Sequence, residues 1–185
     1  MSVATTWGTT PDEREMSFPC DRFMEQPDAA YYRGITIGAR PEVIFRWLCQ
    51  IRVAPYSYDW IDNRGRKSPR VLTRGLDELV IGQQAMGGSA VIDFERDRHL
   101  TIRTIQGSFE WRILGDNLMS YLIVPEDSDG CRLLVKLLVK FPRGPLGWFW
   151  RVFLPWGDLI MLRKQLLNFK ELSEQMSNTT DLREC

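Results

Sequence analysis

The sequence predicts an α+β fold in which a seven-stranded, curved antiparallel sheet wraps around one long C-terminal helix. Three observations predict it. Turn signals recur roughly every 8–12 residues between residues 79 and 130, which is the spacing of consecutive antiparallel strands. Between these turns apolar and polar residues alternate, as expected of a sheet that is covered on one face. After Pro155 the apolar residues change to helical spacing.

The chain has 185 residues, which suits one domain with a substantial core. Residues 1–28 are polar and interrupted by Pro11, Pro19 and Pro27, so they predict an N-terminal arm that lies along the domain or stays mobile. We expect the folded, ligand-binding domain to span residues 29–177. Residues 178–185 are expected to form a polar tail.

The first half of the domain predicts one strand and two short helices. Tyr31–Ile37 has the composition of a strand and is followed by the breaker Gly38. Pro41 suits the first turn of a helix, where its missing N–H costs nothing. Residues 43–51 then show an apolar stripe at steps of three and four. An aromatic segment follows, and a second short helix is expected to end near Gly65.

The second half predicts six strands in series and then the long helix. Residues 90–94, 109–113 and 133–141 each show apolar residues at every second position. In this pattern Asp93 and Glu95 point outward to solvent. The final helix is expected from about residue 155 to residue 176.

The charge balance and the glycine pattern exclude several classes of partner. Lys and Arg number 24, as do Asp and Glu, and the basic residues are spread along the chain. The sequence therefore predicts no nucleic-acid partner. Gly82, Gly87 and Gly88 form neither a P-loop nor a dinucleotide fingerprint, so nucleotide phosphates are not expected.

Histidine and cysteine usage argues against metal chemistry. The single histidine, His99, follows residues that read as a hairpin turn, and we expect it to be a solvated turn residue. Four scattered cysteines without CxxC spacing predict neither a thiolate zinc site nor a disulfide framework. The acidic and basic residues 12–15 stand where a secretory signal would be apolar. We therefore expect a cytoplasmic protein with no metal and no cofactor.

The predicted layers imply a pocket. One helix is roughly 10–12 Å across and cannot fill the concavity of a seven-stranded sheet, so large side chains or a cavity must occupy the remaining volume. Each large residue taken singly is compatible with core packing, whereas the set together favours a cavity. The candidate ligand-binding residues are Trp47, Tyr56, Tyr58, Trp60, Phe94, Phe109, Trp111, Tyr121, Leu162 and Leu166.

Polar groups that point inward would separate binding from catalysis. Asp93 and Glu95 share the outer face and do not serve as an acid–base pair. The candidates for an inward polar group are Tyr58, Tyr121, Arg33 and Asp158. None belongs to a recognised catalytic motif, so the catalytic residues stay unassigned. The residues leave two hypotheses open: a carrier or sensor of an apolar molecule, and an enzyme.

Four segments carry a family resemblance. They are WGTTPDE (residues 7–13), ITIGARPEVIFRWL (35–48), YSYDWIDN (56–63) and LPWGDLIMLRKQLLNFKELSEQ (154–175). They resemble a bacterial branch of the SRPBCC superfamily with WGAT and YSYDW motifs. This superfamily has the helix-grip fold and includes START lipid-transfer domains, polyketide cyclases and the birch pollen allergen. Arg40 and the Val53–Pro55 stretch depart from the pattern of that branch, which bears on the shape of the pocket mouth.

The resemblance implies that the cavity binds an apolar, lipid-like or polyketide-like small molecule, or that a cyclase or dehydratase acts on such a ligand there. It also places the aromatic residues 56–60 at the mouth of the cavity. There they either line the entrance or fasten the short helices to the sheet, with Asp59 as a helix cap. A third hypothesis is an interaction module that uses its sheet edge or this aromatic segment.

The segment Gly144–Trp156 holds three tryptophans and two phenylalanines. It is too short to span a bilayer, which takes roughly 20 mostly apolar residues. It either packs inward as the joint between the last strand and the long helix, or exposes Trp148–Trp150 for transient contact with a membrane interface.

Overall fold

The computed structural model of the chain describes residues 2–58, 60, 65, 67–126 and 130–184, with the backbone alone for residues 180–184. The strands of the described part are β1 (Ala29–Ile37), β2 (Ser89–Glu95), β3 (His99–Thr104), β4 (Asp116–Pro125) and β5 (Cys131–Lys140). Its α-helices are α1 (Val3–Thr6), α2 (Pro11–Glu15), α3 (Pro41–Cys49), α5 (Phe109–Leu114) and α6 (Pro145–Glu184), with 3-10 turns η1 (Pro19–Phe23) and η2 (Gln50–Arg52).

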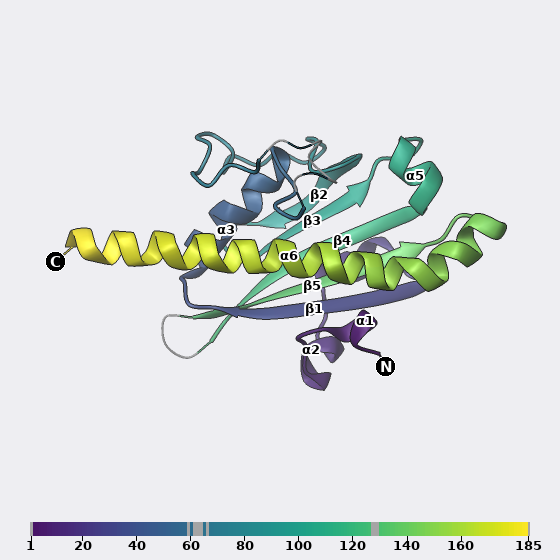
Figure 1. Cartoon of the computed structure of the whole chain (residues 1–185), viewed down its shortest axis with the longest axis horizontal. Helices are drawn as coiled ribbons and strands as arrows, with labels where there is room; N and C mark the ends of the chain where they lie inside the picture. Colours follow the sequence, from purple (N-terminus) through teal and green to yellow (C-terminus); the bar gives the residue numbers. More distant parts are fainter. Residues whose placement is uncertain (1, 59, 61–64, 66, 127–129, 185) are drawn as a thin grey trace.

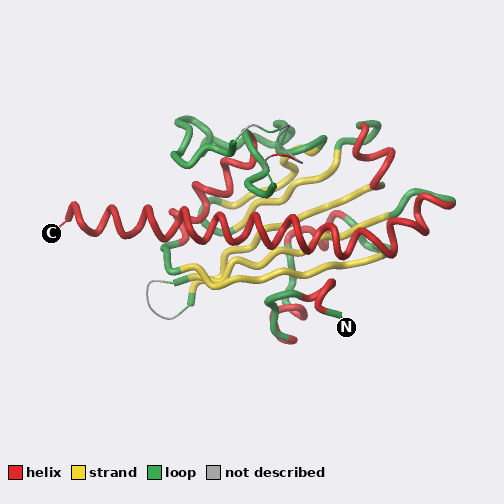
Figure 2. The backbone as a smooth tube through the Cα atoms, viewed as in Figure 1, coloured by secondary structure: helices red, strands yellow, loops and turns green. Residues whose placement is uncertain are grey.

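The strands form one antiparallel sheet in the order β1-β5-β4-β3-β2, and α6 crosses one of its faces (Figure 1). Figure 2 shows that α3 lies on the same side, while α1 and α2 lie at the β1 edge. The predicted α+β class, with an antiparallel sheet and a long C-terminal helix, is confirmed. The predicted number of strands is wrong, since the described sheet has five.

One of the two predicted strands that the sheet lacks, at residues 109–113, is the helix α5 in the structure. The Ser108 hydroxyl caps its N-terminus by accepting a hydrogen bond from Trp111 N (3.1 Å). Gly115 ends it in a left-handed conformation (φ +86°), and a Cβ there would lie 2.1 Å from the Lys140 carbonyl oxygen. The alternation of Phe109, Trp111 and Ile113 suggested a strand, but the capping residues on both sides of it decide for a helix.

The other missing strand was expected just before β2. Residues 79–88 form no strand; they pair with β2 through one isolated bridge, between Gln84 and Ala90, and the few backbone hydrogen bonds around it. Gly82 and Gly87 both have positive φ, so the chain turns twice within six residues and has no room for a ladder. The helix expected in the YSYDWIDN segment involves Asp59 and residues 61–64, which lie outside the described residues.

The long helix is longer than predicted at both ends. It begins at Pro145, ten residues before Pro155, and continues through the expected polar tail. Pro155 therefore stands inside the helix, where it removes one backbone hydrogen bond and favours a kink. In Figure 1 the first turns of α6, at the right-hand end, run at an angle to the rest.

The N-terminal arm packs on the outer face of the sheet, which was expected to be wet. Phe18, Cys20 and Met24 are buried with outward-facing leucines of β4 and β5. Lys136, an outer-face residue of β5, is buried beneath the arm; its Nζ donates to Asp21 (2.5 Å) and lies about 5 Å from the rings of Phe18 and Tyr32. The sheet is thus covered on both faces.

His99 is not a solvated turn residue. It is the first residue of β3, is 7% exposed, and its Nε2 lies 2.9 Å from Asp93 Oδ2. Asp93 also pairs with Arg22 of the arm, so this carboxylate is half-buried in an ion-pair cluster on the outer face. The sequence pattern gave the direction of Asp93 correctly but could not reveal that the arm covers it.

Candidate functional site

A small pocket lies between α6, the sheet and the loop after η2. Its volume is about 100 Å³. Its walls are mostly apolar, with two polar side chains contributed by α6. The lining residues are Pro55, Ser57, Met86, Met119, Asp158, Met161, Leu162 and Gln165.

Asp158 of α6 forms a buried ion pair with Arg33 of β1. Arg33 Nη2 donates to Asp158 Oδ2 at 2.6 Å, and the Arg33 side chain is 0% exposed. The same guanidinium donates to the carbonyl oxygens of Ala4 (2.8 Å), Tyr32 (2.8 Å) and Pro155 (3.3 Å). Arg33 therefore ties α1, β1 and the kink of α6 together at one point.

The carboxyl of Asp158 is buried and has a raised pKa. Burial raises its pKa to about 6, although the neighbouring Arg33 guanidinium opposes this rise. Burial also lowers the pKa of Arg33. Within the described part of the chain no hydrogen bond reaches Oδ1 of Asp158. Since Asp158 lines the pocket, its carboxyl can contact a ligand there.

A second polar group is held by hydrogen bonds. Tyr121 of β4 is fully buried and donates from its hydroxyl to Gln165 Oε1 (2.7 Å). Gln165 Nε2 in turn donates to the carbonyl oxygen of Pro55 (2.6 Å) and lies 3.4 Å from Met86 Sδ. Burial raises the pKa of Tyr121, so the phenol stays protonated and fixes the orientation of the Gln165 amide.

The loop at the pocket is held in a strained conformation. Tyr56 has φ +55°, a left-handed conformation that is unfavourable for an aromatic residue. Its carbonyl oxygen accepts from Asn168 Nδ2 (2.7 Å), and its buried ring packs 5.5 Å from that of Phe169. Strain of this kind persists only where the surroundings over-determine it, and such residues cluster at functional sites. Here α6 fixes the loop against the pocket.

The predicted ligand-binding residues lie in different environments. Trp47, Tyr56, Tyr121 and Leu166 are buried in the core. Leu162 lines the pocket, and Tyr121 reaches it through Gln165. Phe94 is partly buried against the core, and Tyr58 is partly buried. Trp60 and Phe109 are 74% and 73% exposed, and Trp111 lines an outer cleft on α5.

The edge-to-face contact of Trp47 with Tyr56 (6.1 Å) explains why these rings do not line the pocket. Together with Phe169 they fill the interior between α3 and α6. The pocket between α6 and the sheet has methionine side chains in its walls. Phe109 and Trp111 lie on α5 rather than on the inner face of a strand, which takes them away from it.

Sequence reasoning missed Gln165 and the three methionines of the pocket. A usable signal was present for Gln165: it interrupts the apolar stripe formed by Leu162, Leu166 and Phe169. A polar residue on the buried side of an amphipathic helix needs a buried partner. Met86 carried no such signal, because no regular pattern surrounds it.

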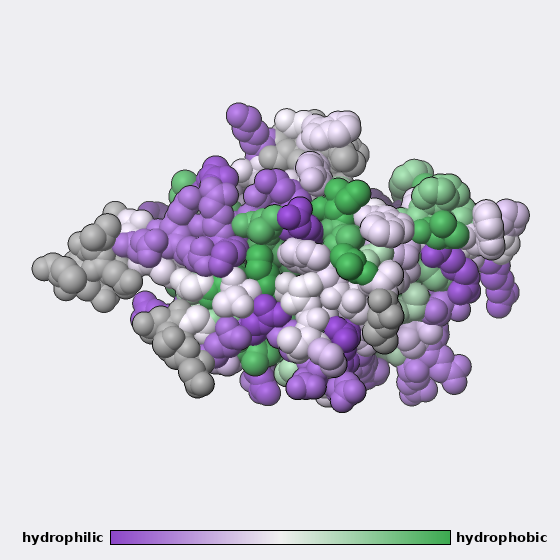
Figure 3. Space-filling model, turned by 60° about the horizontal axis from the view of Figure 1, so that its bottom comes forward, coloured by the Kyte–Doolittle hydropathy of each residue, from purple (hydrophilic) through white to green (hydrophobic). Residues whose placement is uncertain are grey.

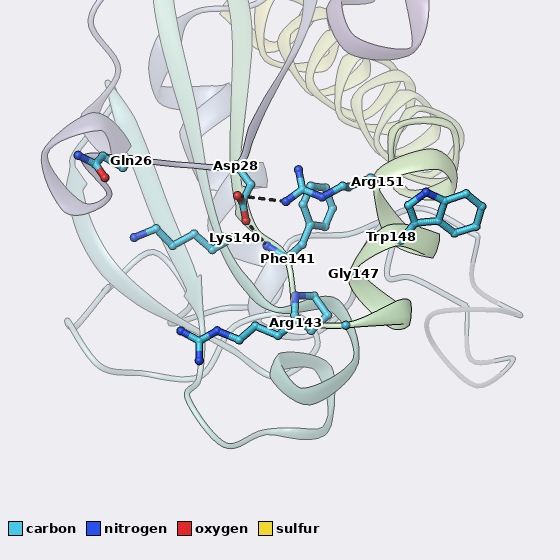
Figure 4. A pocket seen from close by; sticks show the side chains of 10 residues that line it. Gln26, Asp28, Lys140, Phe141, Arg143, Gly147, Trp148 and Arg151 are labelled. Carbon is cyan, nitrogen blue, oxygen red and sulfur yellow. Dashed lines mark hydrogen bonds and ion pairs between the residues drawn. The ribbon is translucent and has the colours of Figure 1, made fainter.

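Larger clefts lie outside the sheet and helix layers. Two of them, about 650 and 790 Å³, share the segment Lys140–Arg143, where β5 leads into α6. Figure 4 shows the first of them, with the Asp28–Arg151 ion pair (3.2 Å) at its centre. Both clefts are open to solvent, and neither contains a buried ionisable group. The inner pocket, where buried polar groups converge on an apolar wall, is the stronger candidate.

The inner pocket can accept one polar group of a mostly apolar molecule. Asp158 Oδ1 accepts a hydrogen bond, or donates one when the carboxyl is protonated. A pocket of about 100 Å³ is smaller than typical ligand sites of roughly 300–1,000 Å³. Its methionine walls are flexible, unbranched side chains that change rotamer readily, so a larger ligand can enter by displacing them.

Comparison with known proteins shows the fold alone. The di-domain ARO/CYC StfQ from the steffimycin biosynthetic pathway superposes with a TM-score of 0.52 at 11% identity, covering 86% of this chain and 55% of StfQ. A protein of Thermus thermophilus gives 0.51 at 14% identity, covering 80% and 99% of the two chains. Protein MLL2253 of Mesorhizobium loti gives 0.51 at 12% identity, covering 80% and 98%.

The likeness establishes a helix-grip fold. No family model matches the chain, and no curated protein matches its sequence. In addition, no described helix is long and apolar enough to cross a membrane.

Proposed function

We propose that this protein binds an apolar small molecule, lipid-like or polyketide-like, in the pocket between the sheet and α6. The observation that carries the proposal is the buried Asp158 carboxyl, which lines a pocket whose other walls are mostly apolar methionine and leucine side chains. A ligand of this class has one polar group for Asp158 or Gln165 and an apolar body for the methionines. The WGTTPDE and YSYDWIDN motifs support assignment to the bacterial SRPBCC branch that they resemble.

Filling the pocket tests this function. Met161→Phe places extra volume in a pocket of about 100 Å³, whereas Ile160→Phe adds an aromatic ring on the exposed side of the same helical turn. With 1-anilinonaphthalene-8-sulfonate as the probe, we expect Met161→Phe to weaken binding about tenfold or more and Ile160→Phe to leave it unchanged. Equal probe binding by the two variants would refute the pocket. If Met161→Phe weakens probe binding as expected, native mass spectrometry of the protein from its own host would identify the ligand.

An enzyme is the second candidate, favoured by the protonation chemistry of Asp158. A carboxyl whose pKa is about 6 exchanges its proton readily near neutral pH, as general acid–base catalysis requires. StfQ, which shares the fold, is named as an ARO/CYC of a biosynthetic pathway. Incubation of a poly-β-ketothioester with wild type and Asp158→Asn, followed by mass spectrometry, separates the candidates. A carrier returns the substrate unchanged, whereas a cyclase or dehydratase converts it only with Asp158 present.

We further propose that Trp148–Trp150 makes transient contact with a membrane, where apolar ligands partition. Trp148 and Phe149 are exposed (70% and 41%), while Trp150 is half-buried. Such aromatic side chains favour the membrane interface. The free, buried cysteines Cys20 and Cys49 support a reducing, cytoplasmic setting.

A further inference from the structure

The first half of α6 carries exposed apolar side chains along its outer side. The residues are Trp148, Phe149, Val152, Phe153, Trp156 and Ile160, which are 41–70% exposed and are called here the α6 stripe. Steps of three and four residues bring most of them to one side, and the rings of Phe149 and Phe153 stack at 4.3 Å. Figure 3 shows apolar surface at the right-hand end, where α6 begins, and again near the middle of the same view.

The opposite side of this part of α6 is buried. Leu159 and Leu162 pack toward the sheet, and Leu154 joins a core cluster with Val139. The helix is therefore apolar on both sides over about four turns. A helix of this kind is normally enclosed in a core, and contiguous exposed apolar surface marks an interaction site.

The charge of the residues around the α6 stripe indicates which kind of partner fits it. Residues 140–164 contain five basic residues, Lys140, Arg143, Arg151, Arg163 and Lys164, and one acidic residue, Asp158. Asp158 is buried against Arg33 and does not offset the surface charge. Arg151 is paired with Asp28, so four basic side chains of this segment have no acidic partner among the described residues.

Two of these charges lie in the cleft at the start of α6. Lys140 and Arg143 are exposed, and among the described residues neither has an acidic partner. In Figure 4 both side chains extend to one side of the cleft, while Trp148 projects on the other side of α6. Arg151 lies between them and is held by Asp28. Lys140 and Arg143 therefore lie across the cleft from Trp148, whereas the exposed Arg163 and Lys164 follow Ile160 at the other end of the α6 stripe.

We propose that the α6 stripe and its flanking basic residues form a docking surface for an anionic lipid bilayer. This inference rests on the membrane contact proposed above and names the class of lipid that it requires. Aromatic and aliphatic side chains enter the boundary between headgroups and acyl chains, and Lys and Arg bind the anionic headgroups. A second copy of the chain is a poorer occupant, because two basic surfaces repel each other.

The docking surface and the ligand pocket share one helical segment. Trp156 and Ile160 are exposed, whereas Asp158, Met161 and Leu162 line the pocket from the other side of the same turns. Pro155 directly precedes this shared segment. An apolar ligand leaving the bilayer at the α6 stripe therefore has only the thickness of one helix to pass.

Co-sedimentation of the full chain with vesicles tests the proposal. The vesicles contain phosphatidylcholine alone or phosphatidylcholine mixed with phosphatidylglycerol, at low and at high salt. We expect binding to the anionic vesicles only, weakened by salt. Lys140→Gln with Arg143→Gln should lower the partition coefficient about fivefold for each charge removed. Trp148→Ser with Trp156→Ser should lower it about tenfold or more.

The controls use equally exposed residues elsewhere. Trp60→Ser removes a tryptophan that is 74% exposed, and Arg40→Gln removes an exposed charge at the start of α3; both should bind as wild type does. Equal sedimentation with neutral and anionic vesicles would overturn the anionic specificity while leaving membrane contact intact. Sedimentation with neither vesicle would overturn both.

Two further measurements keep the failures apart. Analytical ultracentrifugation reports whether wild type is a dimer that Trp148→Ser with Trp156→Ser dissociates; that outcome would make the α6 stripe a self-interface and refute membrane docking. Probe binding is measured in the absence of vesicles. A chain that binds the probe but no vesicle loses the docking surface and keeps the pocket.

Discussion

The ion pair between Arg33 and Asp158 gives the sharpest test of how this fold is held together. We consider Asp158→Leu, Arg33→Met and the double variant. Asp158→Leu leaves a guanidinium that is 0% exposed without its counter-charge. Breaking a buried pair on one side typically costs about 3–5 kcal/mol. Because Arg33 keeps three carbonyl acceptors, we expect a loss near the lower end, about 3 kcal/mol.

Arg33→Met costs stability for different reasons. It removes the donor to the carbonyl oxygens of Ala4 and Pro155, and it leaves Asp158 without a cation. Without the Arg33 guanidinium, which lowers the pKa of Asp158, that pKa rises further and the buried carboxyl binds a proton. In the double variant neither charge is stranded. Its loss should therefore be smaller than the sum of the single losses by about 2 kcal/mol or more.

Urea unfolding followed by far-UV circular dichroism measures all four proteins, and the free energies of unfolding close the cycle. Losses that add within about 0.5 kcal/mol would show that the two side chains are not coupled and would refute the buried pair. Unchanged m-values are needed for this comparison, since a changed m-value reports a different unfolded or native state.

The pH dependence supplies an independent arm of the same test. Burial raises the folded-state pKa of Asp158 above its unfolded value of 3.8, so the protonated form is favoured in the folded chain. Its contribution to stability is fully present below pH 3.8 and is lost as the pH rises through about 6. Between pH 5 and 7.5 wild type should lose about 1 kcal/mol relative to Asp158→Asn. Parallel curves for the two proteins would contradict the raised pKa.

Two further predictions concern α5 and the polar wall of the pocket. Gly115→Ala should destabilise the protein by about 2 kcal/mol or more, because φ is +86° and the new Cβ would meet the Lys140 carbonyl oxygen. The control is Gly107→Ala, at φ +84° with open space around it, which should cost only about 1 kcal/mol. Thermal unfolding compares the two, and equal losses would refute the steric argument. Tyr121→Phe removes the donor to Gln165 and should cost about 1–2 kcal/mol by urea unfolding, with probe binding weakened as the amide loses its fixed orientation. Wild-type stability and binding would show that the hydroxyl is dispensable.

The sequence predicted the layers of the fold because period and punctuation agreed over most of the chain. The first strand was expected at Tyr31–Ile37 from its composition, and the C-terminal helix from apolar residues that share one face. The two surplus strands arose where the spacing of turn signals, or a short alternation of apolar residues, was the sole signal. At residues 109–114 the alternation competed with the caps Ser108 and Gly115, and a six-residue segment is too short for period to outweigh the caps.

The outer face of the sheet could not be predicted from the strands alone. Leu134 and Leu138 interrupt the expected polar face of β5 because they pack against the N-terminal arm. The burial of Lys136 depends on Asp21, which is 115 residues away in the sequence. Only the three-dimensional path of residues 17–24 decides whether that lysine is solvated. The same holds for His99, whose partner Asp93 is also the partner of Arg22 in the arm.

In the candidate site, too, some features follow from local sequence and others depend on residues far apart in the chain. Asp158, Leu162 and Gln165 follow one another at steps of four and three, so their common direction is a property of helical geometry and was readable in principle. What they meet is not local, since Arg33 is 125 residues from Asp158 and Tyr121 is 44 from Gln165. A charge on the buried side of a helix is costly unless a partner compensates it, so Asp158 on this side required a cation on the facing strand. Arg33 is the cation of β1, and it lies at the centre of that strand, next to the kink at Pro155. The same residue therefore joins the sheet to the helix and controls the charge state of the pocket.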